Sequence, residues 1–166
     1  MKSIFGILIL YGMAVVLPPK FSASSVEKNG MKVKWEYKAD RIHFEMQAPT
    51  EGWLAIGFNE ENQLTGTNLI MGAVEADRIK MADDYIVSFG NPRTVESLGG
   101  RNQIEDAKGQ ESDGKTKIAF SLPIRAADQF HFNLDKGKTY HLLIAYSQVD
   151  DFAHHSIMRT SVEIKL

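Results

Sequence analysis

Hydrophobic and polar residues alternate along much of this chain, which is the pattern of strands that bury one face. The alternation begins at residues 31–38, where Val33, Trp35 and Tyr37 fall on one side and lysines and glutamates on the other. It resumes after Asp40 with the same period. The pattern predicts a hairpin with one face on a core and one face in water.

Two later segments are apolar on both faces. Residues 53–59 read WLAIGFN and residues 69–74 read LIMGAV, so each predicts a strand that lies between two layers. Gly57 inside the first strand indicates a bulge or a close approach to the backbone. The polar segment 60–68 that joins them predicts a loop within reach of a ligand.

The C-terminal residues 140–166 predict two more strands with a loop between them. The loop, residues 148–155, carries adjacent aspartates at 150 and 151 and adjacent histidines at 154 and 155. Loops anchored by strands at both ends often hold binding residues. We therefore expect any chemical site of this protein to include the loop.

The rest of the chain fits the same architecture. Residues 78–89 predict one or two strands and residues 115–122 predict another, whereas residues 93–114 are rich in turn formers and predict a long excursion with one edge strand. Short strands, turn signals at most boundaries and no convincing helix predict an all-β fold, an antiparallel β-sandwich of the immunoglobulin-like type.

The N-terminus has the features of a secretory signal peptide. Lys2 is followed by an apolar run at 4–17 and by small residues at 22–25. The run is short for a membrane span. We predict a signal peptide at 1–24, cleaved near residue 23 or 24, and a single secreted or periplasmic domain at 25–166 without a membrane span. An uncleaved N-terminal anchor is the alternative.

Composition narrows the function. Without residues 1–24 the chain keeps 17 basic and 21 acidic groups, a formal charge of −4, and it has no cysteine. This charge and the lack of a basic run argue against a nucleic-acid surface, and a cysteine-free exported domain must depend on its core for stability. Motifs for nucleotide binding, acyl transfer and zinc proteolysis are missing from the sequence.

The histidine pair allows several interpretations. In an extended loop His154 and His155 point in opposite directions, so only one can face a given pocket, and the neighbouring aspartates are close enough to hold an imidazole N–H. A solvent-facing pair, an axial or metal ligand and a general base all remain open. Met71 is either core filler or a soft partner, since methionine and histidine together can ligate haem iron.

An ordered series of motifs resembles the DOMON domain family. The series is GWLAIGFN at 52–59, LTGTNLIMG at 64–72, DDY at 83–85, FSLP at 120–123 and HSIMR at 155–159. It covers nearly all of the predicted mature chain. The resemblance implies an exported β-sandwich of about ten strands that binds haem or sugars, and its haem-binding members are b-type cytochrome domains.

The resemblance also implies candidate ligands. In haem-binding members a methionine and a histidine hold the iron, and by position the histidine is His155, with His154 as the second register. The methionine position is Leu64, which removes the soft ligand, and Met71 is the substitute on the same segment.

Two main hypotheses follow. In the first, the protein binds haem b through His155, with Met71 or no residue opposite, and transfers electrons to a redox partner protein. In the second, it is a non-enzymatic module that takes a sugar or another small ligand in a pocket between Trp53, Phe58 and the loop at 148–155. In a third hypothesis, the protein mediates surface interactions and its pocket is vacant. All three describe a binding or electron-transfer domain rather than an enzyme.

Overall fold

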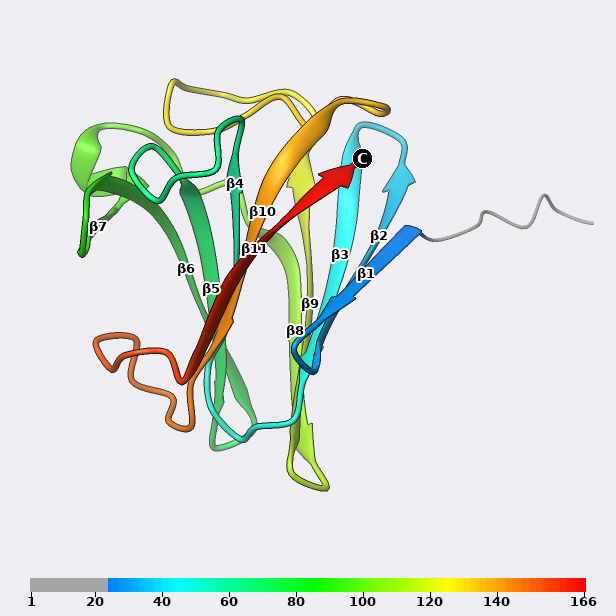
Figure 1. The fold of residues 1–166 in the computed structure, drawn as a ribbon, viewed down its shortest axis with the longest axis vertical. Helices are drawn as coiled ribbons and strands as arrows, with labels where there is room; N and C mark the ends of the chain where they lie inside the picture. The colour runs from blue at the N-terminus through cyan, green and yellow to red at the C-terminus, as the bar shows by residue number, and fades with distance from the viewer. Residues whose placement is uncertain (1–23) are drawn as a thin grey trace, which may run out of the picture.

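The computed structural model describes residues 24–166, which form eleven strands in two antiparallel sheets (Figure 1). The predicted all-β sandwich is confirmed. The signal-peptide prediction falls on residues 1–23, outside the described residues, apart from Ser24, where the first strand begins. Within residues 24–166, no helix has the length and apolar character needed to cross a lipid bilayer.

Sheet A has five strands in the order β1-β2-β3-β9-β8. One face covers the core, and the other carries charged side chains such as Glu45, which pairs with Lys34 at 3.0 Å and with Lys117 at 2.8 Å. The predicted hairpin at 31–46 is confirmed as β2 and β3. The strands of sheet A are β1 (Ser24–Lys28), β2 (Met31–Lys38), β3 (Arg41–Ala48), β8 (Glu105–Ser112) and β9 (Lys115–Pro123).

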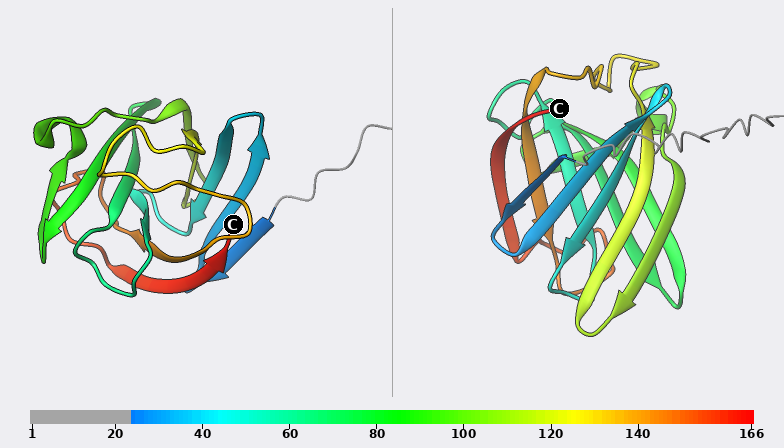
Figure 2. Two further views of the ribbon diagram at one scale, coloured as in Figure 1. Left: turned by 90° about the horizontal axis from the view of Figure 1, so that it is seen from above. Right: turned by 90° about the vertical axis from the view of Figure 1, so that its right-hand side faces the viewer.

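Sheet B has six strands in the order β11-β10-β4-β5-β6-β7. β4 and β5 are buried on both faces, as their doubly apolar sequences predict. The strands of sheet B are β4 (Leu54–Asn59), β5 (Asn68–Glu75), β6 (Arg78–Ser88), β7 (Asn91–Thr94), β10 (Thr139–Tyr146) and β11 (Met158–Lys165). Seen from above, the two sheets form two walls of the molecule (Figure 2).

Aromatic side chains fill the space between the sheets. Phe44 of β3 lies 5.3 Å from Phe58 of β4 and 5.6 Å from Phe120 of β9, measured between ring centroids, and Tyr140 of β10 meets Phe58 edge-on. Each of these residues is at most 2% exposed. Burial of such large rings supplies much of the stability that a chain without disulfides requires.

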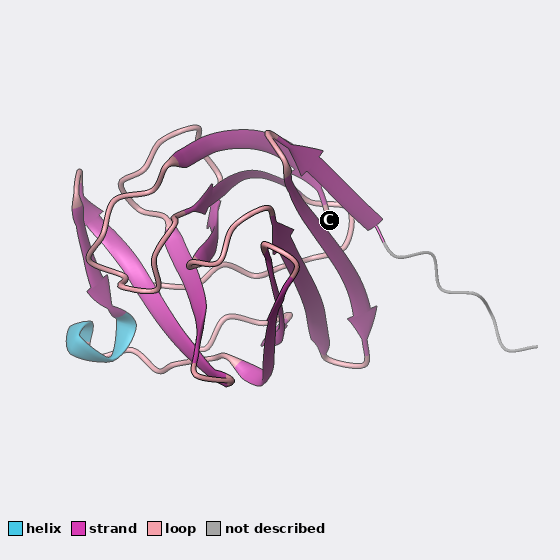
Figure 3. Cartoon of the chain, turned by 90° about the horizontal axis from the view of Figure 1, so that it is seen from below, coloured by secondary structure: helices cyan, strands magenta, loops and turns pink. Residues whose placement is uncertain are grey.

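The excursion at 93–114 is more ordered than its sequence indicates. The structure forms β7, the 3-10 turn η1 (Val95–Leu98) and β8 in this region, and η1 is the one helical segment among residues 24–166 (Figure 3). The predicted edge strand is present as β8, and β7 is a second edge strand that the sequence did not indicate. Both strands lie at sheet edges, where polar side chains are tolerated on either face, so neither gives a hydrophobic signal.

A buried ionic cluster holds the loops at one end of the sandwich. His131 donates through Nε2 to Asp83 at 2.9 Å and through Nδ1 to Asp128 at 2.7 Å. Asp83 also accepts from the Gln103 backbone N–H, and Asp128 accepts from the Arg101 backbone N–H. The cluster therefore joins β6 to the two long loops that precede β8 and β10.

Candidate functional site

The outer face of sheet B, which points away from sheet A, carries a second apolar cluster. This is unusual because the solvent side of an antiparallel sheet is normally polar. The cluster, here called the outer cluster, contains Trp53, Ala55, Leu69, Met71, Ala73, Ile86, Leu143 and Ala145, with Leu64, Ala82 and Phe152 packed against it.

Small residues surround Met71 in the central rows of this face. In the strand register Met71 lies between Ala55 of β4 and Ala82 of β6, and Ala55 is opposite Ala145 of β10. Gly57 occupies the next row, where an added Cβ would come within 2.5 Å of the Thr67 side chain. This is the close approach that the sequence predicts. The central rows of the face thus carry alanine and glycine around Met71, with larger side chains at their margins.

The β10–β11 loop is fixed against one side of the face. The Trp53 backbone exchanges hydrogen bonds with the loop, donating to Val149 O at 3.1 Å and accepting from Ser147 N at 3.0 Å. A side chain at Gly52 would overlap the backbone of residues 147–149. Phe152 packs on the outer cluster, and Lys80 Nζ lies 4.9 Å from its ring centroid. The loop is therefore packed against the outer face and forms part of its surface.

Both loop histidines are exposed. The His155 carbonyl accepts from Ser147 Oγ at 3.2 Å, and His154 N donates to Asp151 O at 2.9 Å, so the backbone is held while the rings face solvent. Within residues 24–166 the Asp151 carboxylate forms no hydrogen bond with either imidazole, and its Oδ1 accepts from Ala153 N. The loop presents two imidazoles beside the apolar face.

Three buried polar atoms near the outer cluster have no hydrogen-bond partner. They are Trp53 Nε1, Asp84 Oδ1 and Asp150 Oδ1. Asp84 is opposite Leu69 in the register, so its side chain shares the outer face. Burial, and then the charge of Asp83, raises the pKa of Asp84 to about 6. Unpaired buried polar groups are rare in folded proteins, so these three atoms make this face a candidate site.

The structure brings together some of the predicted site residues and separates others. Trp53, Met71 and Leu64 meet at the outer cluster, but Phe58 lies between the sheets with no exposed surface. The predicted pocket between Trp53, Phe58 and the loop is therefore not formed. The reason is the alternation of β4, since Trp53 and Phe58 are five positions apart and face opposite sides.

A small hollow adjoins Leu64. It has a volume of about 110 Å³, and polar side chains, among them Gln63, Thr67, His141 and Ser161, line it with Leu64 and Leu143. Sequence reasoning did not select His141 or Asp84. The alternation of β10 and β6 places both on the outer face, and this was the available signal.

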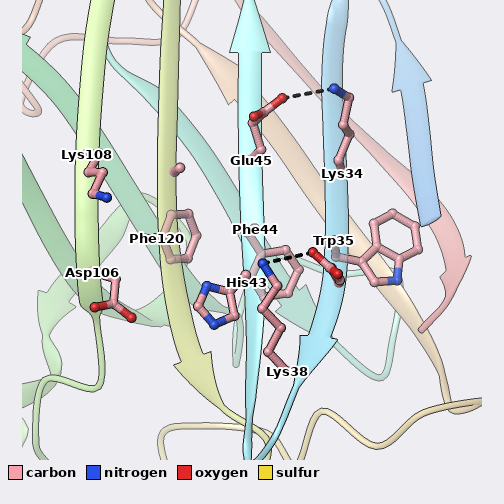
Figure 4. Close-up of a pocket in the computed structure, with 11 residues that line it drawn as sticks. Lys34, Trp35, Lys38, His43, Phe44, Glu45, Asp106, Lys108 and Phe120 are labelled. Carbon is pink, nitrogen blue, oxygen red and sulfur yellow. Dashed lines mark hydrogen bonds and ion pairs between the residues drawn. The ribbon is translucent and has the colours of Figure 1, made fainter. Parts of the chain in front are cut away.

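A larger hollow of about 400 Å³ lies on the opposite side of the molecule, on the outer face of sheet A (Figure 4). His43 and Asp106 project toward each other there, and Lys38 pairs with Glu36 at 3.0 Å. Asp106 sits at a β-bulge and bonds Ser121. Within residues 24–166 no three His, Asp or Glu side chains are grouped to hold a metal ion. Trp35, Phe44 and Phe120 also line the hollow, together with ion-paired side chains such as Glu45.

Comparison with known proteins places the fold and the site in context. A family model described as "DOMON domain" matches residues 27–147. Among curated proteins the chain is 25% identical over 136 residues to DBH-like monooxygenase protein 2 of Mus musculus and 24% identical over 119 residues to MOXD1 homolog 2 of Drosophila melanogaster. These matches cover 80% and 72% of this chain but 21% and 15% of the relatives, so the chain spans about a fifth or less of their length.

Two solved structures share the fold. The cytochrome b domain of pyranose dehydrogenase from Coprinopsis cinerea superposes with a TM-score of 0.62 at 10% identity, over 87% of this chain and 81% of that chain. The cytochrome domain of Myriococcum thermophilum cellobiose dehydrogenase gives 0.57 at 9% identity, over 88% and 82%. At this identity the likeness concerns the architecture.

Proposed function

Because the chain belongs to the DOMON domain family, we propose that it is an exported ligand-binding domain that takes haem b on the outer face of sheet B. The observation that carries this proposal is the outer cluster itself. This second apolar cluster lies on the side of sheet B away from the main core, beside a loop that carries two exposed imidazoles.

The residues present suit a porphyrin in part. The central rows of the face carry alanine and glycine, but the cluster residues are at most 8% exposed, so a ring would take the place of the side chains that now cover them. Trp53 Nε1 has no hydrogen-bond partner, and His155 is an exposed imidazole on a fixed loop. Leu64 carries no donor atom for iron, and Met71 is only 5% exposed. We therefore propose one protein ligand to the iron, His155, with His154 as the alternative register.

Bound haem b would supply a one-electron couple, which the protein tunes through its ligand and its apolar surroundings. The chain's own contribution is to hold and shield the ring. Phe152 and Leu64 would cover part of the ring, and the hydrogen bonds between Trp53 and residues 147 and 149 hold the start of the loop that carries the imidazole. Both the loop and the β6–β7 hairpin project on this side of sheet B (Figure 1). They carry the exposed Phe89 and Ile157, which a redox partner protein would cover.

Reconstitution with haem tests the proposal. The purified protein should bind haem b stoichiometrically and show a Soret band, and His155→Ala should abolish the band while His154→Ala retains it. Loss of the band in His154→Ala alone would move the ligand by one residue. His43→Ala, on the outer face of sheet A, is the matched control and should bind normally. Absence of a Soret band from the unaltered protein would contradict haem binding.

The hollow beside Leu64 favours a second candidate, a non-enzymatic module for a sugar or another small polar ligand. Its polar lining offers donors and acceptors for hydroxyl groups, whereas the outer cluster offers few. Isothermal titration with monosaccharides should then give heat that Thr67→Val reduces. Saturable sugar binding in a protein that binds no haem would favour this function over the first.

A further inference from the structure

A slot at the open edge of the sandwich is distinct from the outer face of sheet B. It lies where the end of β11 passes β2 and where the turn before β10 closes over them, and we call it the seam slot. Trp35, Glu36, Tyr37, Lys136, Lys165 and Leu166 line it, and its volume is about 330 Å³. Small-molecule pockets commonly measure roughly 300–1,000 Å³, so the slot is large enough for a ligand of one ring.

Two aromatic residues of β2 form the inner wall. Trp35 is only 5% exposed, and its Nε1 has no hydrogen-bond partner although the atom is buried. Tyr37 donates its hydroxyl to Leu134 O at 2.8 Å, which fixes the ring. Burial raises the pKa of Tyr37 to about 12, so this wall stays neutral. The slot therefore has an aromatic inner wall, and the Tyr37 ring in it is fixed by a hydrogen bond.

The seam slot is lined by two lysines and one glutamate. Among residues 24–166, neither Lys136 nor Lys165 has a carboxylate within ion-pair distance, whereas the Glu36 carboxylate is neutralised by Lys38 at 3.0 Å. The nearby Asp135 is paired with Arg125 at 3.0 Å. Two ammonium groups thus remain to attract an anion at the mouth of an apolar slot.

We propose that the seam slot binds a small carboxylate carried on a ring. The ring would lie against Trp35 and Tyr37, and the carboxylate would meet Lys136 and Lys165. Aromatic acids and uronic acids share this chemistry, since both join a ring with an apolar face to a carboxylate. The site is independent of haem binding, because Trp35 belongs to sheet A and Trp53 to the outer face of sheet B.

The two tryptophans of the protein make the test specific. In a ¹H–¹⁵N spectrum they give two indole N–H signals, which Trp53→Phe assigns. Benzoate or glucuronate, titrated to millimolar concentration, should shift the Trp35 signal in a saturable way and leave the Trp53 signal in place. A shift with benzoate alone identifies an aromatic acid, and a shift with glucuronate alone a uronic acid. Glucose and benzyl alcohol, which lack the charge, should bind more weakly.

Lysine variants separate the slot from nonspecific binding. The double variant Lys136→Ala with Lys165→Ala should weaken the titration roughly tenfold, while Lys28→Ala with Lys115→Ala, two exposed lysines elsewhere, should leave it unchanged. These surface changes remove no core contact. The proposal is overturned if neither acid shifts the Trp35 signal, or if both double variants weaken binding equally. A normal Soret band in the same protein would show that haem binding stands regardless.

Discussion

At the scale of single residues, the alternation of one strand decides which side chains reach the outer face of sheet B. Trp53, Ala55 and Gly57 point outward from β4 and its preceding residue, while Phe58 enters the core. The same rule places Asp84 on the outer face opposite Leu69. A half-buried carboxylate with an unpaired oxygen is unfavourable when charged, and this carries a measurable consequence for stability.

We expect Asp84→Asn to stabilise the protein at pH 8 by about 1 kcal/mol, after allowance for its partial exposure. The folded-state pKa of Asp84 is raised from 3.8 to about 6. The folded state therefore holds the proton more tightly than the unfolded state, and stability falls as pH rises from about 4 through 6. Urea denaturation at pH 4 and pH 8 measures the effect.

The pH dependence is the decisive part of the Asp84 result. At pH 4 the variant should gain little, because Asp84 is then mostly protonated in the folded protein. Asp77→Asn, in the exposed β5–β6 turn, is the control and should change stability at neither pH. A loss of stability in Asp84→Asn at pH 8 would mean that the charged carboxylate is satisfied.

At the scale of elements, the ionic cluster of His131 with Asp83 and Asp128 holds the long loops onto β6. Both ring nitrogens face carboxylates, so the imidazolium form is favoured. Burial lowers the pKa of His131, but the hydrogen bonds and charges of Asp83, followed by those of Asp128, outweigh burial and raise the pKa overall. The cluster should therefore hold the two loops onto β6 more strongly at low pH than at high pH.

The stabilisation by His131 should be fully present below pH 6.5, near the pKa of an unfolded histidine, and should be lost as pH rises through the raised folded-state pKa. His131→Gln should cost about 3 kcal/mol at pH 6, because it leaves Asp83 buried without its charge partner. Thermal unfolding between pH 6 and pH 9 tests this. The difference between the two proteins should shrink with rising pH, whereas a constant difference would contradict the account.

At the scale of the whole molecule, the sequence predicts the layers better than the site. Strands that bury one or both faces have a recognisable hydrophobic pattern. For this reason the sequence predicts the strands at 31–38, 53–59 and 69–74. β7 and β8 were not resolved as two strands because edge strands carry polar residues on both faces. The separation of Trp53 from Phe58 follows from alternation alone. The partners of His131 and the seam slot depend on contacts between segments distant in sequence, and a single sequence does not show them.

The arrangement of the first and last strands permits a rearrangement of the chain. β1 and β11 contact each other across the open edge of the sandwich, and Ser24 and Leu166 line the same slot. A circular permutant that joins Leu166 to Ser24 through a short Gly/Ser linker and opens the β8–β9 hairpin at Asp113–Gly114 should fold. We expect an equilibrium cost of about 1–2 kcal/mol.

Circular dichroism and cooperative urea unfolding measure the outcome of the permutation. Both residues of the opened turn have positive φ and are exposed, so cutting there removes no core contact. A second permutant, opened at Gly57–Phe58 inside β4, should fail to fold. If the hairpin permutant also fails, the edge between β1 and β11 is not the tolerant junction that the structure indicates.

The proximity of β1 and β11 also bears on how such a module can be used in larger proteins. A domain whose two ends are close together can be inserted into a surface turn of a host protein without disturbing the host's strands. The β10–β11 loop, with its two exposed histidines, lies at the other end of β11 from the corner where Ser24 and Leu166 lie. It would therefore face away from a host protein joined at β1 and β11. Tethering would then take place beside the seam slot and away from the outer cluster.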